Sequence, residues 1–251
     1  MRLSNKVAIV TGASRGIGYA IAQRFISEGA QVVLADIVDA SEQAKTLSTA
    51  TCRAIYVKTD VSSDIDVKAL IQQTTSEFGC IDILVNNAGV EFAKTVVDTT
   101  ESEWDYLMSV NLKGVFLCAR AVIPLMQQQK KGVIINIASE LGLVGEAGVA
   151  AYCASKGGVV MLSKALAIDH GPQGIRVNCL CPGPVATQLL EDVFASSSNP
   201  EEMRKSFESK TVLKRLGRPE DIAAAATFLA SDDSAFMAGA DLVIDGGWTA
   251  S

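Results

Sequence analysis

Short runs of apolar and β-branched residues alternate along this chain with longer stretches of helical periodicity, and this alternation constrains the fold most. We predict strands over 6–11, 31–36, 54–58, 82–86, 132–138, 174–180 and 240–244, and helices over 16–29, 39–49, 64–78, 101–128, 150–170 and 219–230. Runs such as VAIV, VVLA and VIINI are apolar throughout or nearly so, which is typical of strands covered on both faces. The alternation predicts an α/β fold with a parallel sheet and helices on both sides, in the doubly wound order that right-handed crossovers impose.

The whole chain, 1–251, is predicted to form a single domain, because it shows no internal repeat, low-complexity tract or linker. The alternation fails only over 186–212, a long polar segment of helix or loop. A segment of that length is too long for a simple connection, so we interpret it as a lid over a binding site.

Charge and composition exclude several classes of partner. The net charge is −6 and no Lys/Arg run forms a basic patch, so no nucleic-acid partner is expected. No apolar stretch reaches the roughly 18 residues of a membrane span, and MRLSNK at the N-terminus lacks a signal-peptide core, so we expect a cytoplasmic protein. The six cysteines are scattered and His170 is the single histidine, so no metal site is expected.

The segment TGASRGIG, residues 11–18, places three glycines between the first predicted strand and the first predicted helix. Gly12 would permit a tight turn, Gly16 would let the backbone approach a pyrophosphate, and Gly18 would let helix and strand pack closely. This arrangement is typical of dinucleotide binding. Alone it is also compatible with a turn that simply needs glycine.

Acidic residues end the second and third predicted strands. Asp36 could accept hydrogen bonds from an adenosine ribose diol and would repel a 2′-phosphate. Asp60 could reach the adenine. Either carboxylate could instead be a helix cap or an exposed strand-end acid.

Tyr152 and Lys156 lie four positions apart, which places them on one face of a predicted helix. An ammonium near a phenol favours the phenolate and lowers the phenol pKa, so a tyrosine of this kind can exchange a proton with an alcohol or a carbonyl. Ser139 ends an apolar strand at the carboxyl edge, where open α/β sheets bind ligands. Asn111 could hold a water for proton relay or could be an ordinary polar helix residue.

In this order and spacing, TGASRGIG, Asn86-Asn-Ala-Gly89, Asn111, Ser139, Tyr152-x3-Lys156 and Pro182-Gly183 resemble the short-chain dehydrogenase/reductase family. The resemblance covers essentially the whole chain, down to DGG at 245–247. It implies a seven-stranded Rossmann sheet and hydride transfer between a nicotinamide and a secondary alcohol or ketone. It also implies a homotetramer.

The resemblance implies roles for particular residues. Tyr152 is the acid/base, Lys156 bonds the nicotinamide ribose, Ser139 orients the substrate oxygen and Asn111 supports a proton relay. The implied cofactor site comprises Gly12, Ser14, Arg15, Gly16, Ile17, Gly18, Asp36, Asp60, Val61, Asn87, Ala88, Gly89, Tyr152, Lys156, Pro182, Gly183, Val185 and Thr187. Arg15 is a cue for NADP, but Asp36 acts by direct repulsion, so NAD is favoured over NADP.

The expected substrate pocket is apolar. It comprises Ser139, Leu141, Val144, Val149, Tyr152 and Leu189, and the same stretches contain no Arg or Lys that could clamp an anion. Nearby acids, Glu91, Glu140, Glu146 and Glu191, are expected to face water at the rim or, alternatively, to contact the substrate directly. Neutral, largely apolar secondary alcohols and their ketones are therefore the predicted substrates.

Two other functions remain open at this point. A 3-oxoacyl-carrier-protein reductase would use NADPH, which Asp36 disfavours, and such enzymes often carry arginine where this chain has Ile168. A sensor that binds dinucleotide without turnover is a further alternative, against which the intact set of Asn111, Ser139, Tyr152 and Lys156 argues.

Overall fold

One parallel sheet of order β3-β2-β1-β4-β5-β6-β7 organises the protein in the computed structural model, which describes residues 1–195 and 197–250. The strands are β1 (Val7–Thr11), β2 (Gln31–Asp36), β3 (Ala54–Lys58), β4 (Ile83–Asn86), β5 (Gly132–Ile137), β6 (Ile175–Pro182) and β7 (Asp241–Ile244). The strand order reverses between β1 and β4, which is the switch point where such sheets bind ligands. The predicted doubly wound α/β fold is confirmed.

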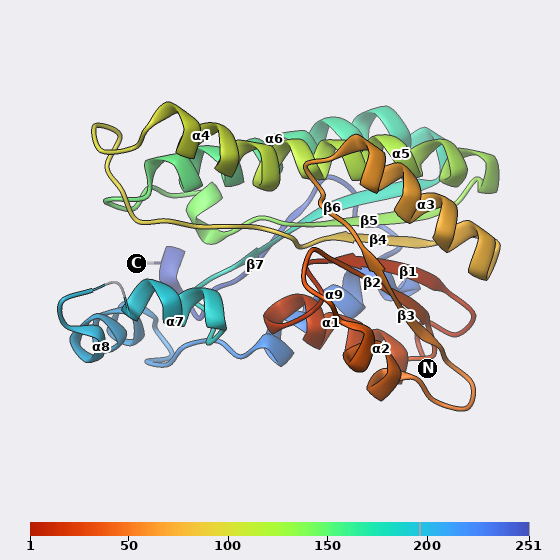
Figure 1. Cartoon of the computed structure of the whole chain (residues 1–251), viewed down its shortest axis with the longest axis horizontal. Helices are drawn as coiled ribbons and strands as arrows, with labels where there is room; N and C mark the ends of the chain where they lie inside the picture. Colours follow the sequence, from red (N-terminus) through yellow and green to blue (C-terminus); the bar gives the residue numbers. More distant parts are fainter. Residues whose placement is uncertain (196, 251) are drawn as a thin grey trace.

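Helices cover both faces of the sheet (Figure 1). One face carries α1 (Gly16–Ser27), α2 (Ser41–Leu47) and α9 (Pro219–Ala230), and the other carries α3 (Asp64–Phe78), α4 (Glu101–Met108), α5 (Gly114–Gln129) and α6 (Ala150–His170). The predicted lid segment holds α7 (Gln188–Ala195) and α8 (Pro200–Lys210), which lie beyond the carboxyl end of the sheet, while Ser196 is outside the described residues.

The apolar strand sequences follow from this three-layer arrangement. Successive side chains of β1 point to opposite faces, so Ala8 and Val10 pack with α1 and α9 while Ile9 packs on the other side with α3 and α5. Because helices cover both faces of the sheet, the side chains on both faces are apolar, and the strand sequences do not alternate between apolar and polar residues.

The predicted helix over 101–128 is wrong as a single regular helix. It consists of α4, a π-helical turn at Ser109–Lys113 and α5. The π turn accommodates one extra residue, a local change that a 3.6-residue apolar pattern does not reveal.

The same stretch, Glu101–Gln129, is long and apolar enough by length and composition to cross a membrane, contrary to the expectation that no stretch reaches such a span. Half of its most apolar window is buried inside the protein. The stretch packs on α3, α6 and the sheet, as a core helix of a folded domain does.

Candidate active site

The glycine-rich turn joins β1 to α1 in a conformation that requires glycine. Gly12 has φ of +63°, and a Cβ at this position would lie 2.8 Å from Cα of Ala88. A Cβ on Gly18 would lie 2.2 Å from the carbonyl oxygen of Gly12, so α1 begins in direct contact with the turn. Both positions therefore have the role that the sequence predicted for them.

A loop after β4 holds this turn in place. The side-chain amide of Asn87 donates to the carbonyl oxygens of Thr11 and Gly12, at 2.9 and 3.0 Å. The hydroxyl oxygen of Thr11 accepts from the backbone N–H groups of Asn87 and Ala88, both at 3.0 Å. The two strand ends at the switch point are thus joined by four hydrogen bonds.

Asp36 stands at the end of β2, and its carboxylate is fixed by backbone donors. Its Oδ2 accepts from the N–H of Ser14 at 2.9 Å and its Oδ1 accepts from the N–H of Val38 at 3.0 Å. The side chain is buried apart from the edge that lines the cleft described below. A negative charge therefore lies fixed beside the glycine-rich turn.

Asp60 also lies at the cleft, but its carboxylate is occupied locally. Its Oδ1 accepts from both the N–H and the hydroxyl of Ser62, at 2.9 and 2.7 Å. This turn lies ahead of α3, whose N-cap is Ser63, and it corresponds to the alternative in which Asp60 caps the approach to that helix.

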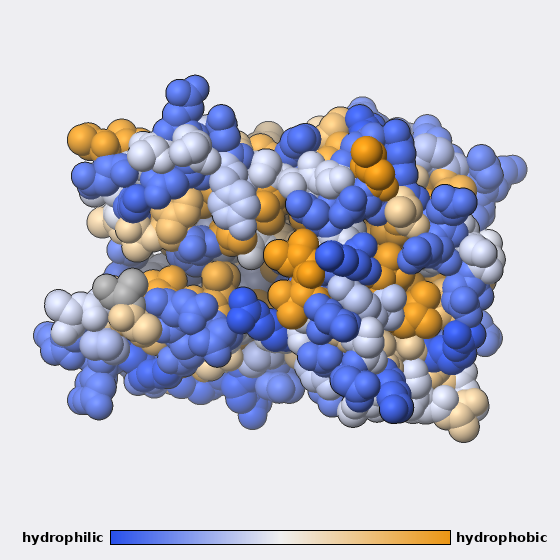
Figure 2. Space-filling view, viewed as in Figure 1, coloured by the Kyte–Doolittle hydropathy of each residue, from blue (hydrophilic) through white to orange (hydrophobic). Residues whose placement is uncertain are grey.

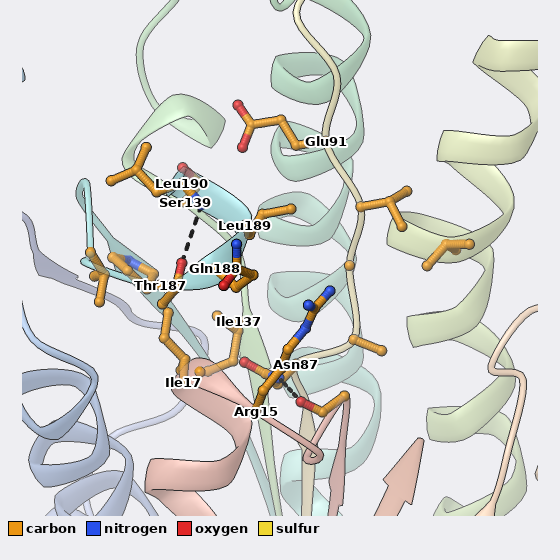
Figure 3. Close-up of a pocket in the computed structure, with 18 of the residues that line it drawn as sticks. Arg15, Ile17, Asn87, Glu91, Ile137, Ser139, Thr187, Gln188, Leu189 and Leu190 are labelled. Carbon is orange, nitrogen blue, oxygen red and sulfur yellow. Dashed lines mark hydrogen bonds between the residues drawn. The ribbon is translucent and has the colours of Figure 1, made fainter. Parts of the chain in front are cut away.

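A cleft of about 360 Å³ runs from the glycine-rich turn along the carboxyl end of the sheet to α7 and α8 (Figures 2 and 3). Its volume lies within the range of small-molecule sites. Most of the predicted site residues line it: Gly12, Ser14, Arg15, Gly16, Ile17, Asp36, Asp60, Val61, Asn87, Ala88, Gly89, Ser139, Leu141, Tyr152, Lys156, Pro182, Gly183, Val185, Thr187 and Leu189.

The cleft does not include every predicted residue. Gly18 lies behind the turn, Asn111 is 1 % exposed beneath the cleft floor, and Val144 and Val149 lie outside the lining. Several lining residues were not predicted, among them Val90, Tyr106, Gln188 and Phe207. Tyr106 and Phe207 sit on helices far apart in the chain, and no motif marks either of them.

Ser139 follows β5 at the cleft floor and is 6 % exposed. Its hydroxyl donates to Oε2 of Glu140 at 2.5 Å and accepts from the N–H of Leu141 at 3.1 Å. These contacts hold the Ser139 hydroxyl in the cleft lining that it shares with Tyr152.

Tyr152 and Lys156 share one face of α6, as predicted, with Nζ of Lys156 5.5 Å from the centre of the Tyr152 ring. That ammonium donates to the carbonyl oxygen of Ile137 at 3.0 Å. Burial lowers the pKa of Lys156 to about 8.

The net pKa shift of Tyr152 is opposite to the lowering that the sequence predicted. Burial, reinforced by the negative charges of Glu91 and Glu140, raises the pKa of Tyr152 well above that of a free phenol. The resting side chain is therefore a protonated phenol, able to donate a proton.

Asn111 lies within the π turn, and both the oxygen and the nitrogen of its side-chain amide form hydrogen bonds. Its Oδ1 accepts from the N–H of Val90 at 2.8 Å, and its Nδ2 donates to the carbonyl oxygen of Val90 at 2.9 Å and to the hydroxyl of Ser155 at 3.2 Å. A Cβ on Gly89 would lie 3.4 Å from Oδ1 of Asn111 and 3.6 Å from Nζ of Lys156, so only a glycine separates these two side chains.

Two of the four acids expected at the rim lie inside the cleft instead. Glu140 is 5 % exposed, and burial raises its pKa to about 7. Glu91 lines the cleft at the end opposite Arg15 (Figure 3), and burial raises its pKa while the charge of Lys156 opposes this. Glu146 and Glu191 form surface ion pairs with Lys210 and Arg204, as expected of rim residues.

The residues present fit a nicotinamide dinucleotide. The turn at Gly12 leaves room that a side chain would fill, the N-terminus of α1 offers backbone donors to a pyrophosphate, and Asp36 presents an acceptor suited to a ribose diol. At the other end of the cleft, Lys156 and Tyr152 can contact a second ribose and a substrate.

Comparison with known proteins agrees with this geometry. A family model described as enoyl-(acyl carrier protein) reductase matches residues 12–249. Meso-2,3-butanediol dehydrogenase of Serratia marcescens is 41% identical over 251 residues, covering 100% of this chain and 97% of the relative. The NADP-dependent (R)-specific alcohol dehydrogenase of Lentilactobacillus kefiri is 42% identical over 253 residues, covering 99% and 98%. The crystal structure of levodione reductase superposes with a TM-score of 0.96 at 34% identity, covering 100% of both chains.

The chain therefore belongs to the short-chain dehydrogenase/reductase family. It is an oxidoreductase that acts on the alcohol/ketone pair, as its sequence predicted.

Proposed function

We propose that this protein is an NAD-dependent dehydrogenase of secondary alcohols, acting in reverse as a ketone reductase. The observation that carries the proposal is the convergence of Ser139, Tyr152 and Lys156 at one end of a cleft whose other end is the glycine-rich turn beside Asp36. A cofactor and a substrate laid along this cleft would meet at the Tyr152 hydroxyl.

The chain's own residues supply proton transfer and orientation. Lys156, anchored on Ile137, holds the nicotinamide ribose, and Ser139 positions the substrate oxygen next to the Tyr152 hydroxyl. In the reduction direction Tyr152 donates its proton to the carbonyl oxygen, and in oxidation it takes the proton from the alcohol. Bound nicotinamide supplies or accepts the hydride.

The proton that Tyr152 loses is restored through groups behind it. Lys156 reaches toward Gly89, and Asn111 lies on the far side of the same glycine. The side-chain amide of Asn111 is held by the backbone of Val90 and by Ser155, which fixes this residue beside Gly89. We propose this route as the proton relay.

Cofactor preference follows from Asp36. Its two oxygens are oriented by Ser14 and Val38, so it stays at the cleft edge, where it accepts from a ribose diol and repels a 2′-phosphate. Arg15 is exposed on the opposite side of the turn and lines the same cleft. We propose NAD as the cofactor, although the Lentilactobacillus relative is named as NADP-dependent.

The substrate class follows from the walls of the cleft. Leu141, Leu189, Leu190, Val90 and Phe207 provide apolar surface, and Glu91 and Glu140 provide negative potential. Neutral secondary alcohols of modest size and their ketones fit these walls. The Serratia relative is named for such an alcohol, meso-2,3-butanediol.

Assembly and location complete the proposal. We propose a homotetramer, because Phe116 on α5 and Met161 and Ile168 on α6 expose 45%, 64% and 77% of their surfaces. A cytoplasmic location agrees with the acidic composition. Mass measurement in solution and fractionation of the source cells test these two points.

One panel tests the function. Purified protein is assayed with NAD and NADP against cyclic, aliphatic, aromatic, sugar and acyl-thioester substrates. Turnover of a neutral secondary alcohol with NAD supports the proposal. Turnover confined to an acyl thioester with NADPH would identify a carrier-protein reductase, and cofactor binding without turnover of any substrate would identify a sensor.

A further inference from the structure

Glu140 is a buried carboxyl group in direct contact with the serine that positions the substrate oxygen. It begins the short 3₁₀ turn Glu140–Gly142, and its Oε2 accepts the Ser139 hydroxyl proton at 2.5 Å. At 5 % exposure it is held in the cleft floor rather than at the surface.

A serine hydroxyl has one proton and two acceptor lone pairs. In this structure the Ser139 proton goes to Glu140, and the N–H of Leu141 takes one lone pair. One lone pair of the Ser139 oxygen remains. In this state Ser139 has no proton left to offer a substrate oxygen, although negative charge develops on that oxygen in the transition state.

A neutral Glu140 reverses this arrangement. A protonated carboxyl group carries an O–H that can donate to the Ser139 oxygen. The Ser139 proton is then free to turn toward the substrate. No covalent bond other than O–H is involved, and the proton on Glu140 comes from solvent.

We propose that Glu140 is a positioning residue that switches the Ser139 hydroxyl between accepting and donating toward the substrate oxygen. This inference rests on the proposed function, because it gives Ser139 the task of orienting that oxygen. The neutral form of Glu140 supports hydride transfer, and the charged form withholds the Ser139 proton.

The charged groups around Glu140 place its titration in the neutral range. Burial and the charge of Glu91 raise its pKa, and the hydrogen bonds from Ser139 and Leu141 lower it, with a result of about 7. Other titratable groups face Glu140 from neighbouring elements: Tyr152 and Lys156 from α6, and Cys181 from β6. The negative charge of Glu140 raises the pKa of each of these groups.

The first test is a titration that does not depend on turnover. In protein labelled with ¹³C at glutamate carboxyl groups, one resonance should titrate near pH 7 and vanish in Glu140→Gln. Glu91→Gln should lower this pKa by removing a neighbouring negative charge. Ser139→Ala should raise it by removing a donor to the carboxylate. These opposite shifts are specific to the proposed contacts.

The second test is the pH profile of kcat/KM for ketone reduction between pH 5.5 and 7.5. In the wild type, kcat/KM should be constant at the acid end of this range. Above the pKa of Glu140 it should decrease, approaching a tenfold loss per pH unit (about the loss expected when one essential proton is removed). In Glu140→Gln, kcat/KM should not change with pH over this range, because the glutamine amide N–H can donate to Ser139 but cannot ionise. Glu146→Gln, a rim glutamate of the same loop, should retain the wild-type fall.

Lys156 requires a separate control, because its pKa of about 8 is supported by the charge of Glu140. In a Ser139→Ala background an effect transmitted through Lys156 would persist, whereas the Ser139 switch would disappear. Glu140→Gln should therefore leave the profile of Ser139→Ala unchanged.

Two results would overturn the inference: a fall near pH 7 that survives in Glu140→Gln, or a Glu140→Gln effect of equal size with and without the Ser139 hydroxyl. Failure of the proposed function is a different outcome, in which the wild type does not turn over any alcohol or ketone. The carboxyl titration still decides whether Glu140 ionises as proposed.

Discussion

Ser14 and Asp36 are joined by a hydrogen bond of 2.9 Å from the backbone N–H of Ser14 to Oδ2 of the aspartate. The contact links the glycine-rich turn to the end of the second strand of the sheet. Under the proposed function Asp36 would have two roles, because the carboxylate proposed to meet the cofactor ribose also holds the glycine-rich turn.

Replacing Asp36 with alanine should narrow the preference for NAD over NADP by about tenfold or more, since loss of one charge repulsion in a partly buried site is worth more than 1 kcal/mol. Loss of the Ser14 contact should also weaken the binding of both cofactors. The measurement is kcat/KM for NAD and NADP in each protein. Asp39→Ala removes a neighbouring acid outside the cleft lining and should leave the ratio unchanged. A wild type that prefers NADP would refute the assignment and point to Arg15.

Replacing Tyr152 with phenylalanine should preserve folding and cofactor binding but reduce kcat by about 10²–10⁴-fold, the usual worth of general acid–base help. Because burial and the nearby acids raise the pKa of Tyr152, oxidation should accelerate as pH rises and more phenolate forms. Tyr106→Phe is the matched control, since Tyr106 lines the same cleft. Near-normal kcat in Tyr152→Phe would exclude it from the mechanism.

Replacing Lys156 with methionine should abolish turnover and change how stability depends on pH. The pKa of Lys156 falls from 10.5 to about 8 on folding, so its buried charge destabilises the native state below pH 8 and ceases to do so as pH rises toward 10.5. Relative to the variant, the wild type should therefore gain up to about 3 kcal/mol of unfolding free energy between pH 7 and pH 10. Urea unfolding at both pH values measures this gain. Lys45→Met, at an exposed lysine of α2, should show none.

Neutral substrates should be preferred over matched carboxylate-bearing ones, because the acidic side chains of Glu91 and Glu140 line the cleft beside its apolar walls. The comparison is kcat/KM for pairs that differ only in a carboxylate. Glu91→Gln should reduce the discrimination severalfold, whereas Glu191→Gln, at the rim, should change it little. A preference for the acid that salt weakens would indicate a cationic site instead.

Movement of the predicted lid can be measured by the fluorescence of Trp248. Phe207 on α8 lies 5.6 Å from the Trp248 ring and itself lines the cleft, while Nζ of Lys210 lies 4.9 Å from the same indole. With Trp104 replaced by phenylalanine, the fluorescence of Trp248 should change when cofactor and a ketone bind together. A constant signal during productive binding would mean that α8 does not move.

The sequence predicted most of the fold because apolar periodicity reports burial directly. The helices over 64–78, 150–170 and 219–230 have the predicted bounds, since each begins and ends where the polar pattern changes. The π turn at Ser109–Lys113 could not be predicted, because one extra residue leaves the apolar pattern on either side intact.

The site was only partly predictable for a related reason. Asp36 ends β2 and Ser139 follows closely after β5, and parallel strands bring their carboxyl ends to one edge, so the presence of both at this edge follows from topology. Glu91 and Glu140 lie in loops whose course depends on packing against α6 and the lid. Their acidic side chains suggested exposure to water, and only the structure shows that the loops turn them into the cleft.

The π turn has a consequence for how this chain can change over evolutionary time. Removing one residue from Ser109–Lys113 would restore a regular helix with its apolar face still available to the sheet, so the deletion would be mild for folding. The cost of the deletion would fall on the site, because the π turn holds Asn111 where its side-chain amide bonds the backbone of Val90 and the hydroxyl of Ser155. In a regular helix Asn111 could not keep these contacts. At this point the length of the chain is under stricter constraint than the identity of most of its residues.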